Sequence, residues 1–113
     1  MRLKSEIWVK AYLRRCAGEG IACAVVRRGD ADAGVIYVKV SRLDGTAALF
    51  GPAWAGLSAQ GSDRRWSLLT DTAADADIEA RLMREARADP DLWVVEIEDR
   101  QGRHFLDGWL AED

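Results

Sequence analysis

The feature that most constrains the fold is a change in the spacing of apolar residues along the chain. Two segments repeat apolar side chains every three or four residues, which is typical of amphipathic helices. The other segments are short and either rich in β-branched residues or alternate apolar with polar side chains, which is typical of strands. The helical segments are residues 6–17 and 74–88, and the strand segments are residues 21–28, 35–42, 46–51, 64–70 and 92–99.

The order of these segments predicts the fold class. Runs of neighbouring strands with two separate helices favour an α+β fold, with a mostly antiparallel sheet of about five strands in the order α-β-β-β-β-α-β. Residues 103–106 are a candidate for a last, short edge strand. A chain of 113 residues has the length of one domain, so residues 1–113 are expected to form a single domain.

Turn residues connect the first three strands. The segment GDADAG at residues 29–34 supplies two glycines that are free to take a positive φ. Asp-Gly at residues 44–45 favours a hairpin. We therefore expect the first three strands to form an antiparallel meander. The apolar strand at residues 21–28 is expected to be covered on both faces, or nearly so.

The helical and strand periods together predict the core and the helix ends. Ser5 is expected to cap the first helix, and either Asp71 or Thr72 the second. The apolar faces are expected to meet in one buried cluster. Its predicted members are Trp8, Tyr12, Leu13, Ile36, Val38, Leu49, Val95 and Ile97.

The composition excludes several classes of protein. Hydrophobic residues make up 49% of the chain and charged residues 31%, which is typical of a globular protein rather than a disordered one. No apolar run approaches the ~20 residues that a membrane helix needs, and no signal-peptide pattern follows Met1. Together with the low number of cysteines, these features predict a protein of the reducing cytoplasm with no membrane partner.

Three long stretches of the chain carry a resemblance to a known family. They are RLKSEIWVKAYLRR at residues 2–15, RRGDADAGVIYVKVSRLDGTAALFGPA at residues 27–53 and DPDLWVVEIEDRQGRHFL at residues 89–106. In these stretches the chain resembles the small bacterial proteins grouped as domain of unknown function 1491. The likeness covers nearly the whole length and is weakest over residues 54–88. The resemblance implies a free-standing cytoplasmic bacterial protein and supplies no catalytic residues.

Side chains that carry enzyme chemistry are scarce. His104 is the only histidine, and Cys16 and Cys23 lie in buried segments without forming a C-x-x-C motif. No phosphate-binding or calcium-binding loop is present, so we predict neither a cofactor nor a metal. One enzyme hypothesis remains, in which an acidic cluster near the C-terminus supplies an acid and a base if the last strands pair. The alternative is a solvated strand face. The residues concerned are Glu96, Glu98, Asp99 and His104.

Charge is divided unevenly between the two halves of the chain. Residues 1–65 hold 11 Lys and Arg against 6 Asp and Glu, whereas residues 66–113 hold 5 against 13. Such asymmetry can arise from a basic half that contacts nucleic acid, or from halves that complement each other within one chain or between two copies. It can also arise from a charged face that meets only solvent, which is the interpretation that this pattern favours most. The net charge of −3 disfavours nucleic acid.

The first helix is predicted to present a surface to a partner. Opposite its core face, Ile7 and Ala11 lie among cationic side chains, and Trp54 lies in the loop that follows Pro52. Trp and Arg are enriched at binding hot spots. We therefore predict a protein-interaction module, most of all a homodimer, with a nucleic-acid or phosphorylated-ligand binder as the alternative and an enzyme ranked last. The candidate partner-binding residues are Lys4, Ile7, Lys10, Ala11, Arg14, Arg15 and Trp54.

Overall fold

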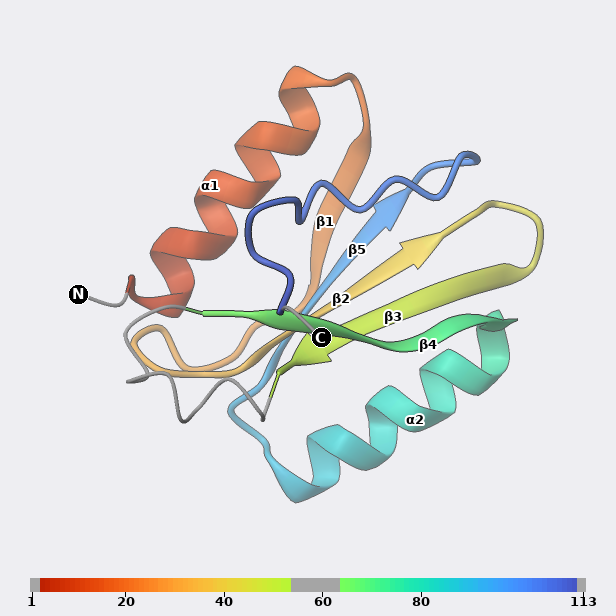
Figure 1. Cartoon of the computed structure of the whole chain (residues 1–113). Helices are drawn as coiled ribbons and strands as arrows, with labels where there is room; N and C mark the ends of the chain where they lie inside the picture. Colours follow the sequence, from red (N-terminus) through yellow and green to blue (C-terminus); the bar gives the residue numbers. More distant parts are fainter. Residues whose placement is uncertain (1–2, 54–63, 112–113) are drawn as a thin grey trace.

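The computed structural model describes residues 3–53 and 64–111 and contains two helices and one sheet of five strands (Figure 1). The predicted α+β class and element order are confirmed. The helices are α1 (Ser5–Gly18) and α2 (Asp75–Ala88), and the strands are β1 (Ala22–Arg27), β2 (Ile36–Ser41), β3 (Thr46–Pro52), β4 (Trp66–Ala74) and β5 (Trp93–Glu98).

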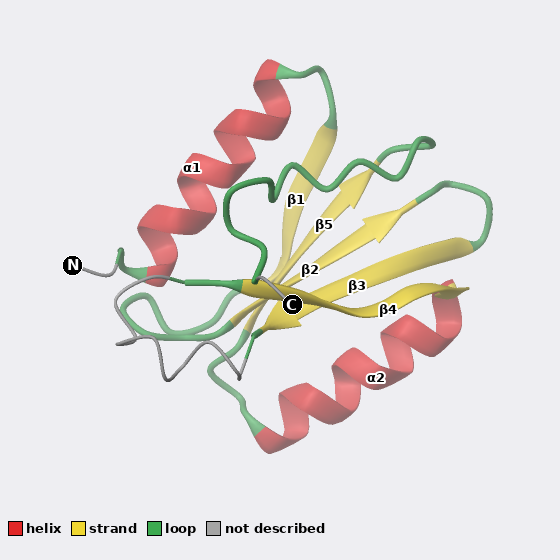
Figure 2. Ribbon diagram, in the orientation of Figure 1, coloured by secondary structure: helices red, strands yellow, loops and turns green. Residues whose placement is uncertain are grey.

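The strands lie in the order β1-β5-β2-β3-β4, so β1 and β4 form the two edges of the sheet (Figure 2). β5 pairs antiparallel with β1 and parallel with β2, whereas the remaining neighbours are antiparallel. The predicted meander of the first three strands is therefore wrong at its first step. β1 and β2 are separated by the last strand of the chain.

The start of β5 suits this inner position because its side chains are apolar on both faces of the sheet there. Trp93, Val95 and Ile97 belong to the core cluster beside α1, and Leu92 and Val94 belong to the cluster beside α2. β1 is rich in small residues and lies largely exposed at the edge, contrary to the prediction that it is covered on both faces. An inner strand buries two faces, and β5 has the side chains to fill both.

The sheet separates two cores rather than enclosing one, because α1 packs on one face and α2 on the other (Figure 1). The larger core gathers aromatic residues, with Trp8 stacked on Tyr12 and on Trp66. Leu49 was predicted to share that core but lies in the cluster with α2. Leu13 is only partly buried at the margin of the α1 cluster. The other predicted core residues lie together as expected.

The ends of both helices differ from the predicted capping. Ser5 is buried inside the first turn of α1, where its hydroxyl donates to the Gly34 carbonyl at 2.6 Å and accepts from Arg64 at 2.7 Å. α2 begins at Asp75, with Ala74 at the N-cap, because β4 continues through both predicted capping residues, Asp71 and Thr72.

The two glycines of the first turn serve close packing rather than a positive φ. Neither Gly29 nor Gly34 is in the left-handed region. A Cβ atom at either position would collide with the carbonyl oxygen of Asp91. The amide of Asp30 donates to that same oxygen at 2.9 Å. The turn thus needs glycine because the chain before β5 lies directly against it.

The segment after β5 crosses the α1 side of the sheet without forming the predicted strand at residues 103–106. Phe105 and Leu106 are buried in the α1 cluster, and the Tyr12 hydroxyl donates to the His104 carbonyl. Further along, the amide of Trp66 donates to the Trp109 carbonyl at 2.8 Å. The segment completes the cover that α1 begins. Within the part of the chain that is described, neither helix is long and apolar enough to cross a membrane.

Candidate functional site

The outward side of α1 combines positive charge with exposed apolar surface. Its members are Lys4, Ile7, Lys10, Ala11, Arg14 and Arg15, which we call the basic helix face. Side chains at these spacings share one side of a helix. Ile7 is 51% exposed at its centre. The structure therefore places these six predicted residues together at the surface, whereas Trp54 lies outside the described residues.

The cations of the basic helix face are only partly neutralised by neighbours. Lys4 lies 3.6 Å from Asp32, and Arg15 lies 3.6 Å from Glu19, in both cases with exposed side chains. Such surface pairs contribute little to stability. Lys10 and Arg14 form no ion pair with any residue of 3–53 or 64–111. Two positive charges therefore lie one and two turns beyond Ile7 on the same side of α1, without an ion pair in the described chain.

A second surface was not predicted from the sequence and lies on the α2 side of the sheet. α2 packs against β3 and β4, at one end of the sheet (Figure 1). At the other end, Ala22, Ala24 and Glu98 are exposed and Glu96 is half-buried. These four residues, which we call the open sheet face, are paired across β1 and β5, with Ala22 opposite Glu98 and Ala24 opposite Glu96.

The open sheet face is bordered by a buried lysine that is shared among carboxylates. The Nζ atom of Lys39 lies 2.6 Å from Asp75, 2.5 Å from Glu79 and 3.7 Å from Glu96. Burial alone would lower the pKa of Lys39, but the hydrogen bonds to Asp75 and Glu79 outweigh it and raise that pKa. One positive charge therefore faces three carboxylates, and this region of the surface carries a net negative charge.

Glu96 is partly buried beside Lys39. Its partial burial raises its pKa, against the opposing effect of Lys39. Glu98, one pleat further along β5, is exposed and forms no ion pair within the described residues. The acidic character of the open sheet face is therefore concentrated at the end of β5.

The four residues of the acid–base hypothesis do not come together. Glu96 and Glu98 point to the α2 side of the sheet, whereas Asp99 and His104 lie on the α1 side. Asp99 is occupied by Arg103, which bonds its carboxylate through Nε at 2.9 Å and Nη2 at 3.2 Å and lowers its pKa to about 2. His104 accepts the Leu106 amide at Nδ1. The sheet itself separates the proposed acid from the proposed base.

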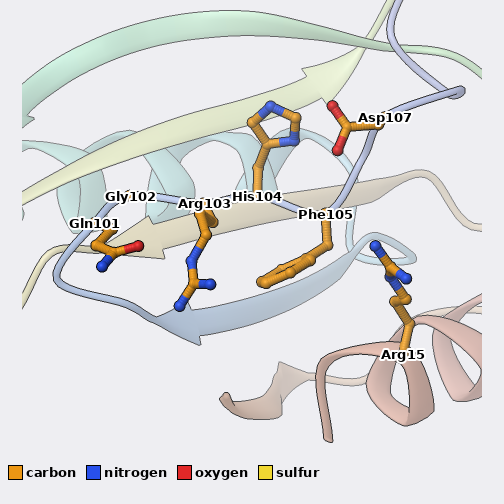
Figure 3. A pocket seen from close by; sticks show the side chains of 7 residues that line it. All are labelled: Arg15, Gln101, Gly102, Arg103, His104, Phe105 and Asp107. Carbon is orange, nitrogen blue, oxygen red and sulfur yellow. The ribbon is translucent and has the colours of Figure 1, made fainter. Parts of the chain in front are cut away.

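An open pocket of about 320 Å³ lies where the C-terminal segment passes the end of α1 (Figure 3). The guanidinium carbons of Arg15 and Arg103 are 5.5 and 5.6 Å from the centre of the Phe105 ring and lie to either side of it. Both arginines already have acidic neighbours, Glu19 and Asp99. The two guanidinium groups therefore contact the Phe105 ring from either side instead of converging on one point in the pocket. We interpret them as contacts that hold this ring.

Phe105 also has an unusual backbone conformation. Its φ is 54°, a left-handed value that costs on the order of 1 kcal/mol or more for a side chain of this kind. The bonds from Tyr12 and Leu106 to His104 fix the residue before it. The sequence offered no signal for this arrangement, because it depends on contacts between α1 and the C-terminal segment.

The two cysteines are placed as structural residues. Both are free, with Cys16 buried on α1 and Cys23 half-buried on β1. Their thiols share a hydrogen bond, which together with burial raises the pKa of the Cys23 thiol and which lowers the pKa of the Cys16 thiol. The raised pKa lowers the thiolate fraction of Cys23 and with it the reactivity of that thiol, whereas Cys16 is shielded by its burial.

Comparison with known proteins places the chain among relatives that share most or all of its length. A family model described as "Protein of unknown function (DUF1491)" matches residues 3–107. A crystal structure of a DUF1491 family protein from Caulobacter crescentus CB15 is 43% identical, with a TM-score of 0.81 over 99% of this chain and 100% of that chain. A solution structure of a protein from A. tumefaciens is 40% identical, with a TM-score of 0.74 over 87% and 86%. No curated protein matches the chain.

Proposed function

The chain belongs to the DUF1491 family, whose function is unknown, and we propose that it is a protein-interaction module that self-associates through the basic helix face. The observation that carries this proposal is the exposure of Ile7 on the same side of α1 as Lys10 and Arg14, two cations without an ion pair in the described chain. Apolar contact supplies the hold in such interfaces, and charge sets orientation and association rate.

Self-association should double the mass of the protein in solution. We expect a species of twice the 12.5 kDa chain mass at micromolar concentration. Because exposed charges are screened within about 8 Å at physiological salt, the dimer should weaken as salt is raised. Light scattering after gel filtration, at low and high salt, measures both effects. A monomer at every concentration and salt would refute self-association.

A matched pair of variants locates the interface. Ile7→Glu places a carboxylate at the centre of the basic helix face and should yield a folded monomer. Met83→Glu introduces the same carboxylate on α2, where Met83 is 58% exposed, and should leave the dimer intact. Equal dissociation by both variants would show that the effect is not specific to α1. The melting temperature of each variant establishes that it is folded.

The same basic surface makes nucleic acid the rival partner, and a separate measurement distinguishes it. Binding to phosphates by Lys and Arg falls steeply with salt. The net charge of −3 speaks against such binding. Retention of the wild-type chain on heparin, lost in Lys10→Glu/Arg14→Glu, would favour nucleic acid and would replace the dimer as the proposed function.

The role is proposed for the cytoplasm of a bacterium. Two free cysteines within contact of each other fit a reducing compartment. The 40–45% identity to chains from two bacteria supports the bacterial source. Fractionation of cells that produce a tagged chain tests the location. Recovery in the periplasmic or membrane fraction would contradict it.

A further inference from the structure

We propose that Cys16 and Cys23 form a peroxide-sensitive pair, in which hydrogen peroxide oxidises the two thiols to a disulfide within the folded chain. The inference is independent of self-association, because it concerns the joint between α1 and β1 rather than the basic helix face. It starts from the placement of two free thiols that share a hydrogen bond. Sulfur atoms in such contact need only a small movement to reach the separation of a covalent bond.

The connection between α1 and β1 holds the two cysteines in this position. The helix and the strand run in opposite directions and are joined by a short turn (Figure 1). The amides of Glu19 and Ile21 both donate to the Cys16 carbonyl at 3.0 Å, and Gly20 takes the positive φ of 74° that this helix end requires. Cys16 belongs to the α1 cluster, and Cys23 packs against the same cluster from β1. Hydrogen-bonded backbone on both sides of the turn therefore keeps the thiols together.

The two thiols differ in their access to solvent and in their acidity. Cys23 is half-buried on an edge strand, where a small oxidant can reach it, whereas Cys16 is buried. The shared hydrogen bond raises the pKa of the Cys23 thiol and lowers the pKa of the Cys16 thiol, which also shares a hydrogen bond with the Tyr12 hydroxyl. Cys23 is therefore the thiol that meets the oxidant, slowly because little of it is thiolate. Cys16 is the nucleophile that completes the disulfide.

The reaction has two steps. The Cys23 sulfur first attacks one oxygen of hydrogen peroxide, the O–O bond breaks, and a sulfenic acid forms while the other oxygen leaves as water with the thiol proton. The Cys16 sulfur then attacks the Cys23 sulfur, the S–O bond breaks, and the oxygen leaves as a second water with the proton of the Cys16 thiol. Two electrons pass from the thiols to the peroxide, so no further reductant or oxidant is needed.

Mass spectrometry of the folded, reduced wild-type chain tests the proposal. The chain is exposed to hydrogen peroxide, unfolded and treated with N-ethylmaleimide. We expect a single chain that has lost about 2 Da, the mass of two hydrogen atoms, and that takes up no maleimide. Trypsin and a glutamate-specific protease cut after Arg15, Glu19 and Arg27, so the disulfide should link the peptide of residues 16–19 to that of residues 20–27.

Single variants test the role of each thiol. Cys16→Ala removes the nucleophile, so Cys23 should stop at the sulfenic acid, which dimedone traps, or continue to the sulfinic acid. Cys23→Ala leaves only the buried thiol, which should still react with maleimide after the same exposure and unfolding. Circular dichroism establishes that each variant is folded. Oxidation of Cys23→Ala as fast as the wild type would contradict entry of the oxidant at Cys23.

The melting temperature distinguishes a bond that fits the fold from one that distorts it. A disulfide that closes a loop without strain stabilises the folded chain, so the oxidised wild type should melt about 5 °C above the reduced chain, and a reductant should reverse the change. Cys16→Ala/Cys23→Ala controls for oxidation elsewhere and should melt at the same temperature before and after peroxide. A lower melting temperature of the oxidised wild type would overturn the proposal. So would a disulfide between two chains, or two free thiols after an exposure that oxidises Cys23 in Cys16→Ala.

Discussion

The two faces of the sheet are covered to different extents. On one face, α1 and the C-terminal segment together cover β1, β5 and β2, and the aromatic side chains of Trp8, Tyr12 and Trp66 stack beneath them. On the other face, α2 covers β3 and β4 and leaves the alanines of β1 exposed. The first face is closed by two separate segments of the chain, and the second by one helix that is too narrow for five strands.

This difference shows how a small α+β chain can leave part of its sheet uncovered. A helix is about 10 Å wide and neighbouring strands lie about 4.8 Å apart, so one helix covers two or three strands. The strands beyond it keep an exposed face. In this chain that face carries alanine and glutamate instead of large apolar residues, so its exposure to water is tolerated.

The largest expected effect comes from opening the aromatic core. Trp8 is 2% exposed and contacts three aromatic rings, including Trp109 in an edge-on arrangement. Trp8→Ala should lower the free energy of unfolding by about 3–5 kcal/mol. Urea denaturation followed by circular dichroism measures it. A loss below about 1 kcal/mol would mean that the α1 side is not the principal core.

Disrupting the core beside α2 should lower the free energy of unfolding by a smaller amount, and both cores should unfold in one transition. Ile78 is 1% exposed and anchors α2 to the sheet together with Leu82. Ile78→Ala should cost about 2–4 kcal/mol, less than Trp8→Ala because fewer atoms are removed. Comparison of far-UV and tryptophan signals during unfolding tests whether the two sides unfold together. Separate transitions would show that the two cores are independent.

The sequence predicted the side-chain faces of β5 but not its neighbours. Alternation placed Trp93, Val95 and Ile97 on one face and Leu92 and Val94 on the other, and the structure confirms this. Its insertion between β1 and β2 left no local signal, because a parallel pair is joined by a long connection rather than by a turn. The meander was inferred from Gly29 and Gly34, which instead allow the chain before β5 to pass close to the turn.

Strand order also explains why one surface could be predicted from the sequence and the other could not. The basic helix face follows from helical spacing alone, because α1 needs only one buried side to orient its other side. The open sheet face joins β1 to β5, segments about 70 residues apart, and depends on where α2 ends up. Glu96 and Glu98 were visible as alternating acids, but whether they met Asp99 or Ala24 depended on strand order.

A smaller effect is expected at the bond that fixes the C-terminal segment to the end of β5. Asp99→Asn removes the charge that Arg103 binds and should lower stability at pH 7 by about 1–2 kcal/mol. The pKa of Asp99 is lowered to about 2 in the folded chain, from an ordinary value of 3.8. The carboxylate therefore contributes stability above about pH 4, and this contribution is lost as the pH falls through 2. Wild type and variant should converge at that pH in acid denaturation.

The smallest expected effect comes from the same substitution, alanine to valine, made once on each face of the sheet. Ala24 lies on the open sheet face and Ala48, 6% exposed, lies in the α1 cluster. Ala48→Val overfills a packed core and should cost about 1–3 kcal/mol. Ala24→Val adds a β-branched residue to an exposed strand and should change the free energy of unfolding by less than about 0.5 kcal/mol. Both are measured in the Ile7→Glu background, so that dissociation does not contribute. If Ala24→Val costs as much as Ala48→Val, the sheet is covered on both sides of β1 and no open face exists.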